Sequence, residues 1–233
     1  MDDQHTSNFI IEQFKKVQSN KVLNSERTHA VHVSNLTGSC MRKPWYEFHQ
    51  PELPVDYKSI CNFFLGTLLH ENVKLGERNE IPVSANIRTM TPIKAEEING
   101  QNFYDCITGT IDDLVNVDGE TIIVDKKTAN RIPEQPAPGY VLQINIYKLL
   151  LFINEKIEIK RGAILYLDKP SSFMESKCFV FDLMGLDEIK KMVIEKMDQL
   201  KMDSEPRRIV TDKCDWCPFL KICDPYNNGG FKN

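Results

Sequence analysis

Two kinds of hydrophobic periodicity divide the chain into helical and extended segments. Apolar residues that recur every three or four positions predict helices at 9–18, 59–78, 138–152 and 186–202. Alternating or short continuous apolar runs predict strands at roughly 81–93, 103–117, 120–128, 161–167 and 177–182. Helices around a meander of strands predict a mixed α/β core, and segments that carry cysteine stand at both of its ends.

The hairpin predicted between two of these strands carries charges where apolar side chains would pack better. The Asp-Gly pair at 118–119 is typical of a two-residue hairpin turn. The register of such a turn sets Asp112 opposite Asp125 on one face, with Cβ atoms roughly 4.5 to 5.5 Å apart. Lys127, two residues beyond Asp125, points to that face as well. Facing like charges destabilise a sheet unless they are neutralised, so the hairpin predicts a site for Mg²⁺ or Mn²⁺.

Alternatives remain open for each polar residue near this hairpin. The two acids could lie on a solvated face with Lys127 as a surface charge, and a one-residue change of register would separate them. Gln143 and Tyr147, four residues apart on a predicted helix, share a face and could bind nucleic acid or lie in an ordinary interface. His70 falls in an amphipathic helix, where a lone histidine is more often structural than a ligand.

The C-terminal stretch CDWCPFLKIC sets three cysteines in a C-x2-C-x5-C pattern. Thiolates at this spacing hold a metal or a cluster and need a fourth ligand, for which Cys40 is the best candidate. Three separately buried thiols are the alternative, and the spacing does not separate zinc from iron–sulfur. Cys61, Cys106 and Cys178 stand alone and are interpreted as buried free thiols. The pattern comprises Cys214, Cys217 and Cys223.

Composition narrows the class of protein less than the motifs do. The 233 residues are 41% hydrophobic and 27% charged, as in a globular protein. A net charge of -4 is weak evidence against nucleic acid, since a local basic groove can coexist with an acidic exterior. No apolar run approaches the roughly 20 residues that span a bilayer, and no signal peptide is recognisable, so a cytoplasmic protein without membrane contact is expected.

Four motifs taken together resemble the RecB-like branch of the PD-(D/E)XK nucleases. They are GTLLH ending at His70, GTID ending at Asp112, the D-x-K of Asp125 and Lys127, and Q-x-x-x-Y at Gln143 and Tyr147, in the order of that family. The resemblance implies a restriction-endonuclease-like core with a mixed central sheet flanked by helices. It implies that His70, Asp112, Asp125 and the main-chain carbonyl of Lys126 bind Mn²⁺ or Mg²⁺. Lys127 would orient or deprotonate the attacking water, and Gln143 and Tyr147 would position the DNA strand.

The cysteines narrow the resemblance further. One upstream cysteine, a basic-aromatic stretch, the nuclease core and C-x2-C-x5-C are together similar to the fourth Cas protein of CRISPR adaptation, over residues 34–225. That family implies a 4Fe–4S cluster on Cys40, Cys214, Cys217 and Cys223, within a subdomain formed by both ends of the chain. It also implies a 5′→3′ exonuclease on single-stranded DNA that trims DNA before integration, with the integrase proteins as partners. Asp125 stands where many relatives have Glu.

The corresponding division of the chain is an N-terminal segment at 1–57, a nuclease core at 58–203 and a cysteine segment at 204–233. Rival functions remain a repair or viral nuclease outside CRISPR and a non-catalytic DNA- or partner-binding module. The second rival has no use for the complete set of motif residues. The stretch after Cys40 could supply charge and stacking for single-stranded DNA or form a packed collar around that cysteine. Its residues are Arg42, Lys43, Trp45 and Tyr46.

Overall fold

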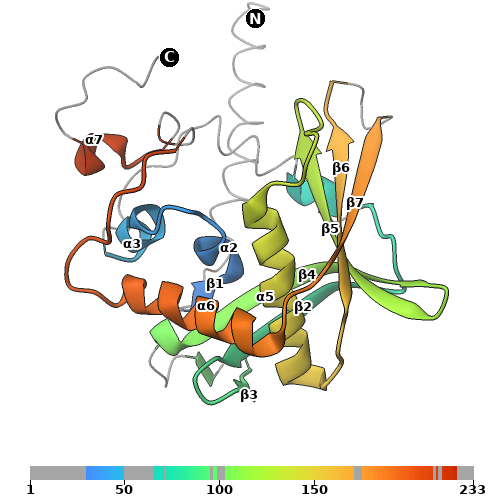
Figure 1. Cartoon of the computed structure of the whole chain (residues 1–233), viewed down its shortest axis with the longest axis horizontal. Helices are drawn as coiled ribbons and strands as arrows, with labels where there is room; N and C mark the ends of the chain where they lie inside the picture. The colour runs from blue at the N-terminus through green and yellow to red at the C-terminus, as the bar shows by residue number, and fades with distance from the viewer. Residues whose placement is uncertain are drawn as a thin grey trace, which may run out of the picture.

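The protein is built on one mixed β-sheet with helices packed against it (Figure 1). The computed structural model describes residues 30–49, 66–70, 72–94, 97–98, 103–170, 175–211, 214 and 217–224. Seven strands lie in the order β3-β2-β4-β5-β6-β7, and β1 pairs with β4. They are β1 (Val31–His32), β2 (Arg78–Asn86), β3 (Thr91–Pro92), β4 (Cys106–Val117), β5 (Glu120–Ala129), β6 (Arg161–Asp168) and β7 (Ser176–Asp182). The β1–β4 and β5–β6 pairs are parallel and the others antiparallel, which confirms the predicted mixed α/β class.

The helix α5 lies in the apolar core and is in contact with it on most of its sides. The other helices pack around this core. The helix α5 (Pro138–Glu155) begins with proline, whose fixed φ suits the first turn, and packs against β2, β5 and β6. Next to it lies α6 (Leu186–Leu200), which buries one face of its amphipathic sequence. The shorter elements are α2 (Val33–Leu36), α3 (Arg42–His49), α7 (Leu220–Cys223) and the 3-10 turn Phe103–Asp105.

The hairpin of β4 and β5 has the predicted register up to the acids and then opens. Asp118 and Gly119 take left-handed φ angles of 52° and 85°, as the turn requires. The antiparallel ladder runs from Val117 opposite Glu120 to Asp113 opposite Val124 and ends there. The predicted direct pairing of the next two residues across the ladder is therefore wrong. From this point β5 continues as the parallel neighbour of β6.

The segment that was predicted as a helix at 59–78 is shorter in its described part. Residues 66–70 are helical, and the strand β2 already begins at Arg78. The N–H groups of Leu75 and Gly76 bind the carboxylate of Asp113, 2.8 and 3.2 Å away, so a contact with a distant strand ends the helix. The strand predicted at 81–93 divides into β2 and β3, and the helix predicted at 9–18 lies outside the described residues.

Both ends of the described chain pack together on one side of the sheet (Figure 1). The rings of Tyr46 on α3 and Phe219 stack with centroids 5.2 Å apart. The indole N–H of Trp45 donates to the carbonyl of Met202 over 2.9 Å. The predicted division at 57/58 and 203/204 stays a prediction. No helix within the described part is long and apolar enough to cross a membrane.

Gly109, the glycine of the GTID motif, allows α2 and α5 to approach β4 closely. A Cβ atom there would lie 2.8 Å from Cε1 of Tyr147 and 2.8 Å from Cγ2 of Val33, closer than real Cβ contacts. Tyr147 and Val33 are both buried, so neither side chain can move aside freely. The glycine therefore sets how tightly α5 covers the strand that carries Asp112.

We expect Gly109→Ala to lower the free energy of unfolding by about 1 to 3 kcal/mol, because it overpacks a filled interface. Gly66 is the matched control, since it is helical and nothing lies within 4 Å of an added Cβ. Gly66→Ala should raise stability by up to about 1 kcal/mol through helix propensity. Urea denaturation of both variants measures the difference, and equal effects would contradict the packing argument.

Candidate active site

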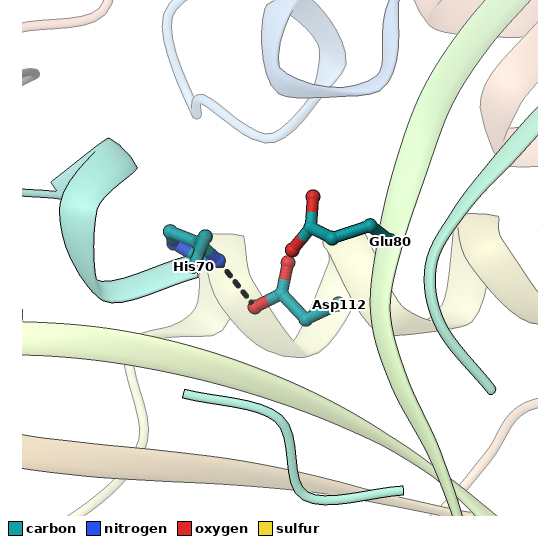
Figure 2. A group of neighbouring side chains, drawn as sticks. All are labelled: His70, Glu80 and Asp112. Atoms are coloured by element: carbon teal, nitrogen blue, oxygen red, sulfur yellow. Dashed lines mark ion pairs between the residues drawn. The ribbon is translucent and has the colours of Figure 1, made fainter. Parts of the chain in front are cut away.

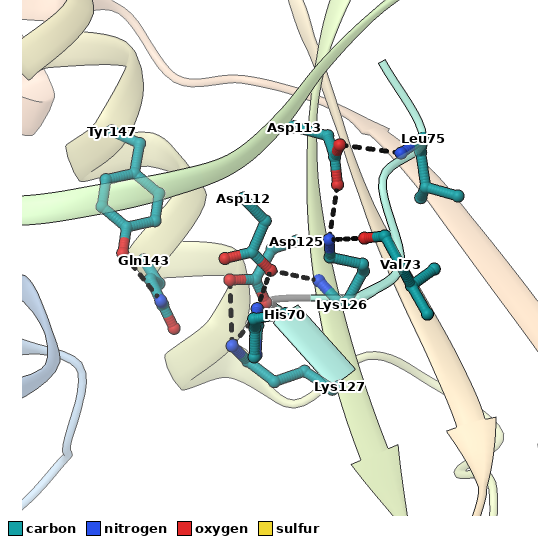
Figure 3. Close-up of polar contacts among 10 residues, drawn as sticks. All are labelled: His70, Val73, Leu75, Asp112, Asp113, Asp125, Lys126, Lys127, Gln143 and Tyr147. Carbon is teal, nitrogen blue, oxygen red and sulfur yellow. Dashed lines mark hydrogen bonds and ion pairs between the residues drawn. The ribbon is translucent and has the colours of Figure 1, made fainter. Parts of the chain in front are cut away.

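The two hairpin acids are buried where β4 and β5 separate. Asp112 is 6% exposed and Asp125 is 0% exposed, so the alternative of a solvated pair is wrong. Oδ2 of Asp112 accepts the main-chain N–H of Lys126 over 2.7 Å, a bond that takes the place of the missing ladder contact (Figure 3). Separation of the strands thus brings both carboxylates into one small space through their side chains.

His70 lies against Asp112. Its Nδ1 atom is 3.0 Å from Oδ2 of Asp112, and it comes from the helical residues 66–70 (Figure 2). The imidazole of His70 therefore contacts a carboxylate of the site, so its role is not only to pack the face of its helix. The structure brings together three residues of the sequence motifs, namely His70, Asp112 and Asp125.

Glu80 joins this group and was missed from the sequence. One oxygen of Glu80, one nitrogen of His70 and one oxygen of Asp112 lie within 4.8 Å of one another (Figure 2). In the β2–β4 register Glu80 falls opposite Asp112, but it leaves the ladder with a left-handed φ of 47°. Partial burial and the charge of Asp112 raise the pKa of Glu80. Nothing local in RNEIPV marks this glutamate, because its place depends on pairing with a strand about 30 residues away.

Lys127 brings a positive charge to the same space. Its Nζ atom lies 2.9 Å from Oδ1 and 2.7 Å from Oδ2 of Asp125, and 4.9 Å from the ring centroid of Tyr140. Burial alone would lower the pKa of Lys127, but the charges of Asp125 and Asp112 outweigh it and the pKa is raised. Burial raises the pKa of Asp125 to about 6, opposed by Lys127 and reinforced by Asp112.

Gln143 and Tyr147 of α5 complete the side of the site that faces the helix. Nε2 of Gln143 donates to the hydroxyl of Tyr147 over 3.1 Å (Figure 3). Tyr147 is 2% exposed, and burial followed by the charge of Asp125 raises its pKa. The pair lies beside the acids as the resemblance implied, and its role in binding a DNA strand stays a prediction.

These side chains fit a divalent cation. Buried carboxylates in a small space repel one another, and the oxygen ligands with one imidazole suit Mg²⁺ or Mn²⁺. The group whose ligand atoms lie close enough to hold the ion comprises His70, Glu80 and Asp112. The predicted use of Asp125 as a further ligand stays a prediction. The predicted use of the main-chain carbonyl of Lys126 as a ligand stays a prediction.

A pocket lined by cysteines lies where the first and last segments of the described chain meet. Cys40, Cys214, Cys217 and Cys223 line one pocket together with Arg42 and Lys43. All four cysteines are free, and none of them is fully buried. The sulfur of Cys223 accepts from Nη1 of Arg42, and that of Cys214 from the N–H of Thr211, each over 3.3 Å. Burial raises the pKa of the Cys217 thiol. A metal or cluster bound to these cysteines stays a prediction.

The other cysteines differ in their surroundings. Cys106 is buried, as predicted, and Cys61 lies outside the described residues. Cys178 is exposed, so its interpretation as a buried thiol is wrong. It lies on β7, an outer strand of the sheet, which the pattern of apolar residues along the strand does not distinguish from an inner one.

The basic-aromatic stretch after Cys40 packs around the cysteine pocket. Tyr46 is 0% and Trp45 7% exposed, and Arg42 donates to the carbonyl of Pro206 over 2.8 Å. The side chain of Lys43 is 54% exposed and lies 3.8 Å from Glu47. Burial of the two rings favours the collar alternative that the sequence left open. Contact with DNA stays a prediction for all four residues and fits Lys43 best.

A mixed sheet whose hairpin separates around buried carboxylates, with a histidine and a lysine beside them, offers side chains that can bind a divalent cation and support phosphodiester hydrolysis. The chain belongs to the PD-(D/E)XK nuclease superfamily, whose model matches residues 35–224. Members of this superfamily use divalent metals such as Mg²⁺ or Mn²⁺, which agrees with the acidic and histidine ligands found here.

Comparison with solved structures supports the fold. The structure described as "Crystal structure of SSO0001" superposes with a TM-score of 0.62 at 19% identity, and the match covers 93% of this chain and 97% of that chain. At this identity the likeness establishes a shared fold. A comparison with curated proteins found no match.

The raised pKa of Asp125 makes the stability of the metal-free protein depend on pH. Its pKa rises from 3.8 to about 6 in the folded protein, so the folded state binds this proton more tightly than the unfolded state. That contribution is complete below about pH 4 and is lost as pH rises through 6. We expect a loss of up to about 3 kcal/mol of unfolding free energy, which Asp125→Asn should remove.

Urea denaturation of EDTA-treated protein between pH 4 and 7 measures this as the difference between wild type and variant. Exposed Asp203 provides the control, and Asp203→Asn should follow the wild type at every pH. Parallel pH curves for wild type and Asp125→Asn would contradict the prediction.

Proposed function

We propose that the protein is a Mn²⁺- or Mg²⁺-dependent DNA exonuclease that acts 5′→3′ on single strands and carries a 4Fe–4S cluster. Its proposed role is to trim DNA before CRISPR integration, in the cytoplasm and in contact with the integrase proteins. The observation that carries the nuclease assignment is the arrangement of two buried carboxylates with partly buried partners, His70 against Asp112 and Lys127 against Asp125. The cluster is supported by the four cysteines that line one pocket, whereas the CRISPR role rests on the sequence resemblance alone.

The acidic side chains and His70 are the proposed ligands of the catalytic cation. A divalent cation held there supplies a Lewis acid that neutralises charge on the scissile phosphate and lowers the pKa of water. The Lys126 N–H bond to Asp112 keeps that carboxylate turned into the site, and burial keeps competing water away from Asp125. Glu80 extends the ligand set at the more exposed side.

Lys127 is the proposed catalytic lysine. Its raised pKa keeps the ammonium group protonated at neutral pH, where it can orient the attacking water and offset the charge that develops on the phosphate. The carboxylate of Asp125 and the ring of Tyr140 hold its Nζ atom in place. The Gln143 amide, beside Tyr147, is placed to position a DNA strand along α5.

The proposed cluster joins segments that are far apart in the sequence. Cys40 and Cys214 are separated by more than 170 residues, and closing so long a loop removes much freedom from the unfolded chain. Cluster binding therefore stabilises the packing of α3 against the C-terminal segment. Thiolates stabilised by Arg42 and by the N–H of Thr211 suit this structural role.

Cleavage of end-labelled single-stranded DNA with Mn²⁺ tests the nuclease assignment. Lys127→Met should lower the rate by at least about 100-fold, the size typical of a lost charge-stabilising donor, while Mn²⁺ still binds. Lys191→Met on α6 is the control and should cleave as the wild type does. Comparison of 5′- and 3′-labelled substrates gives the polarity. A wild type that binds DNA without cleaving it would instead support a binding module.

Iron and sulfide analysis of anaerobically purified protein tests the cluster. The wild type should be brown and hold about four irons per chain, and Cys214→Ala should lose both colour and iron. Cys178→Ala, on the exposed strand β7, should keep both. A colourless wild type with stoichiometric zinc would exclude the cluster and leave the nuclease assignment standing.

A further inference from the structure

An ion pair lies buried directly behind the acids of the site. Asp113 and Lys126 follow Asp112 and Asp125 in their strands, so their side chains point to the opposite face of the sheet. Both are 0% exposed, and Nζ of Lys126 lies 2.9 Å from Oδ2 of Asp113 (Figure 3). Because two buried charges lose hydration, such a pair is weak evidence for stability in itself. The presence of this buried ion pair therefore indicates a role other than stability.

Among the described residues, the other side-chain bonds of this pair go to one short segment, residues 73–76. Nζ of Lys126 donates to the carbonyl of Val73. Oδ1 of Asp113 accepts the N–H groups of Leu75 and Gly76, over 2.8 and 3.2 Å (Figure 3). Gly76 also lies against β4 so closely that a Cβ atom would fall 2.0 Å from the carbonyl oxygen of Leu114. The pair therefore clamps this segment onto the hairpin.

The clamped segment joins the two ligand candidates that do not belong to the hairpin. On its N-terminal side the N–H of Val73 donates to the carbonyl of Leu69 over 2.9 Å, which continues the helical turn that carries His70. On its C-terminal side β2 begins at Arg78 and carries Glu80. The position of the segment thus determines how His70 approaches Asp112. Glu80 is held instead by the pairing of its neighbours Asn79 and Ile81 with β4.

We propose that Asp113 and Lys126 are positioning residues that hold His70 against the metal site from the opposite face of the sheet. Lys126 acts at two points, since its main-chain N–H fixes Asp112 and its ammonium group fixes the segment after His70. The inference rests on the proposed metal-dependent function and deepens it. A pair that served only the stability of the fold would have no specific effect on His70.

The variants are chosen so that each one folds. Lys126→Met alone leaves a buried carboxylate unpaired, so the main variant is the double substitution Asp113→Leu/Lys126→Met, which strands no charge and also removes the oxygen that accepts from Leu75 and Gly76. Lys148→Met is the matched control. Lys148 is another lysine of 5% exposure whose Nζ donates to a carbonyl, that of Met184, over 2.8 Å, and it lies on α5 away from residues 73–76.

Mn²⁺ affinity, measured by electron paramagnetic resonance in the wild-type and the His70→Ala backgrounds, is the primary readout. In the wild-type background the double variant should bind Mn²⁺ about 10- to 100-fold more weakly, as losses of supporting contacts do in metal sites. In the His70→Ala background the same substitutions should have little further effect, because the residue that they position is gone. Lys148→Met should leave the affinity unchanged in both backgrounds.

Hydrogen exchange of the Leu75 and Gly76 amides in metal-free protein is the second readout. The double variant should exchange these amides faster than the wild type does, whereas Lys148→Met should not. Unchanged Mn²⁺ affinity in the double variant, or an equal loss with and without His70, would overturn the inference and leave the nuclease assignment intact. A wild type that binds no Mn²⁺ would overturn the proposed function itself, and the inference with it.

Discussion

The main-chain ladder between β4 and β5 ends at Asp113 and Val124, and the site is built around this ending. Beyond it the strands separate, β5 continues beside β6, and the backbone of Lys126 bonds to the side chain of Asp112 instead of to a strand. The separation lets the side chain of Asp112, rather than a main-chain group of β4, meet the backbone of β5. Asp125 is fully buried at this point. A binding site for a small cation arises from the way in which two strands part.

Charge is balanced separately on the two faces of the separated strands. On the side of the site Lys127 partly neutralises Asp125, and the remaining negative charge is what a divalent cation would compensate. On the opposite side Lys126 neutralises Asp113 almost alone, with both groups hidden from water. Consecutive residues of a strand point to opposite faces, so two adjacent acids can take unrelated roles. One face carries the candidate metal site, and on the other face the charges of Asp113 and Lys126 are paired with each other.

The first and last segments of the described chain pack together as a second unit beside the sheet. Residues of α3 that looked suited to nucleic acid instead pack against the C-terminal segment, where the ring of Tyr46 stacks on Phe219. The cysteine sulfurs gather beside them, and Arg42 contacts one of these sulfurs. Packing of this unit brings α3 and α7, near the two ends of the described chain, to the same side of the sheet as α6 (Figure 1). The helix α6 contacts both α3, beside the cysteine pocket, and α5, beside the candidate metal site, and so links the two regions.

The start of α5 at Pro138, the strands from β4 to β7 and the hairpin register up to Asp113 could be predicted from the sequence, because turn chemistry and periodicity act over a few residues. The helix α5 runs three residues beyond its predicted end, and the short elements β1, α2, α3 and α7 were not predicted. The motif residues could be named for the same reason, since their spacing along a strand or helix sets which face they share. Glu80 could not be found, because its place depends on pairing between distant strands. Nor could the role of Lys126 be found, since a lysine between Asp125 and Lys127 has no local signature of burial until its partner Asp113 is known. Short-range patterns decided the elements and the residue types of the site. Tertiary packing decided which charges are buried, which partners they meet and where the ladder opens, because burial and pairing depend on residues far apart in the chain.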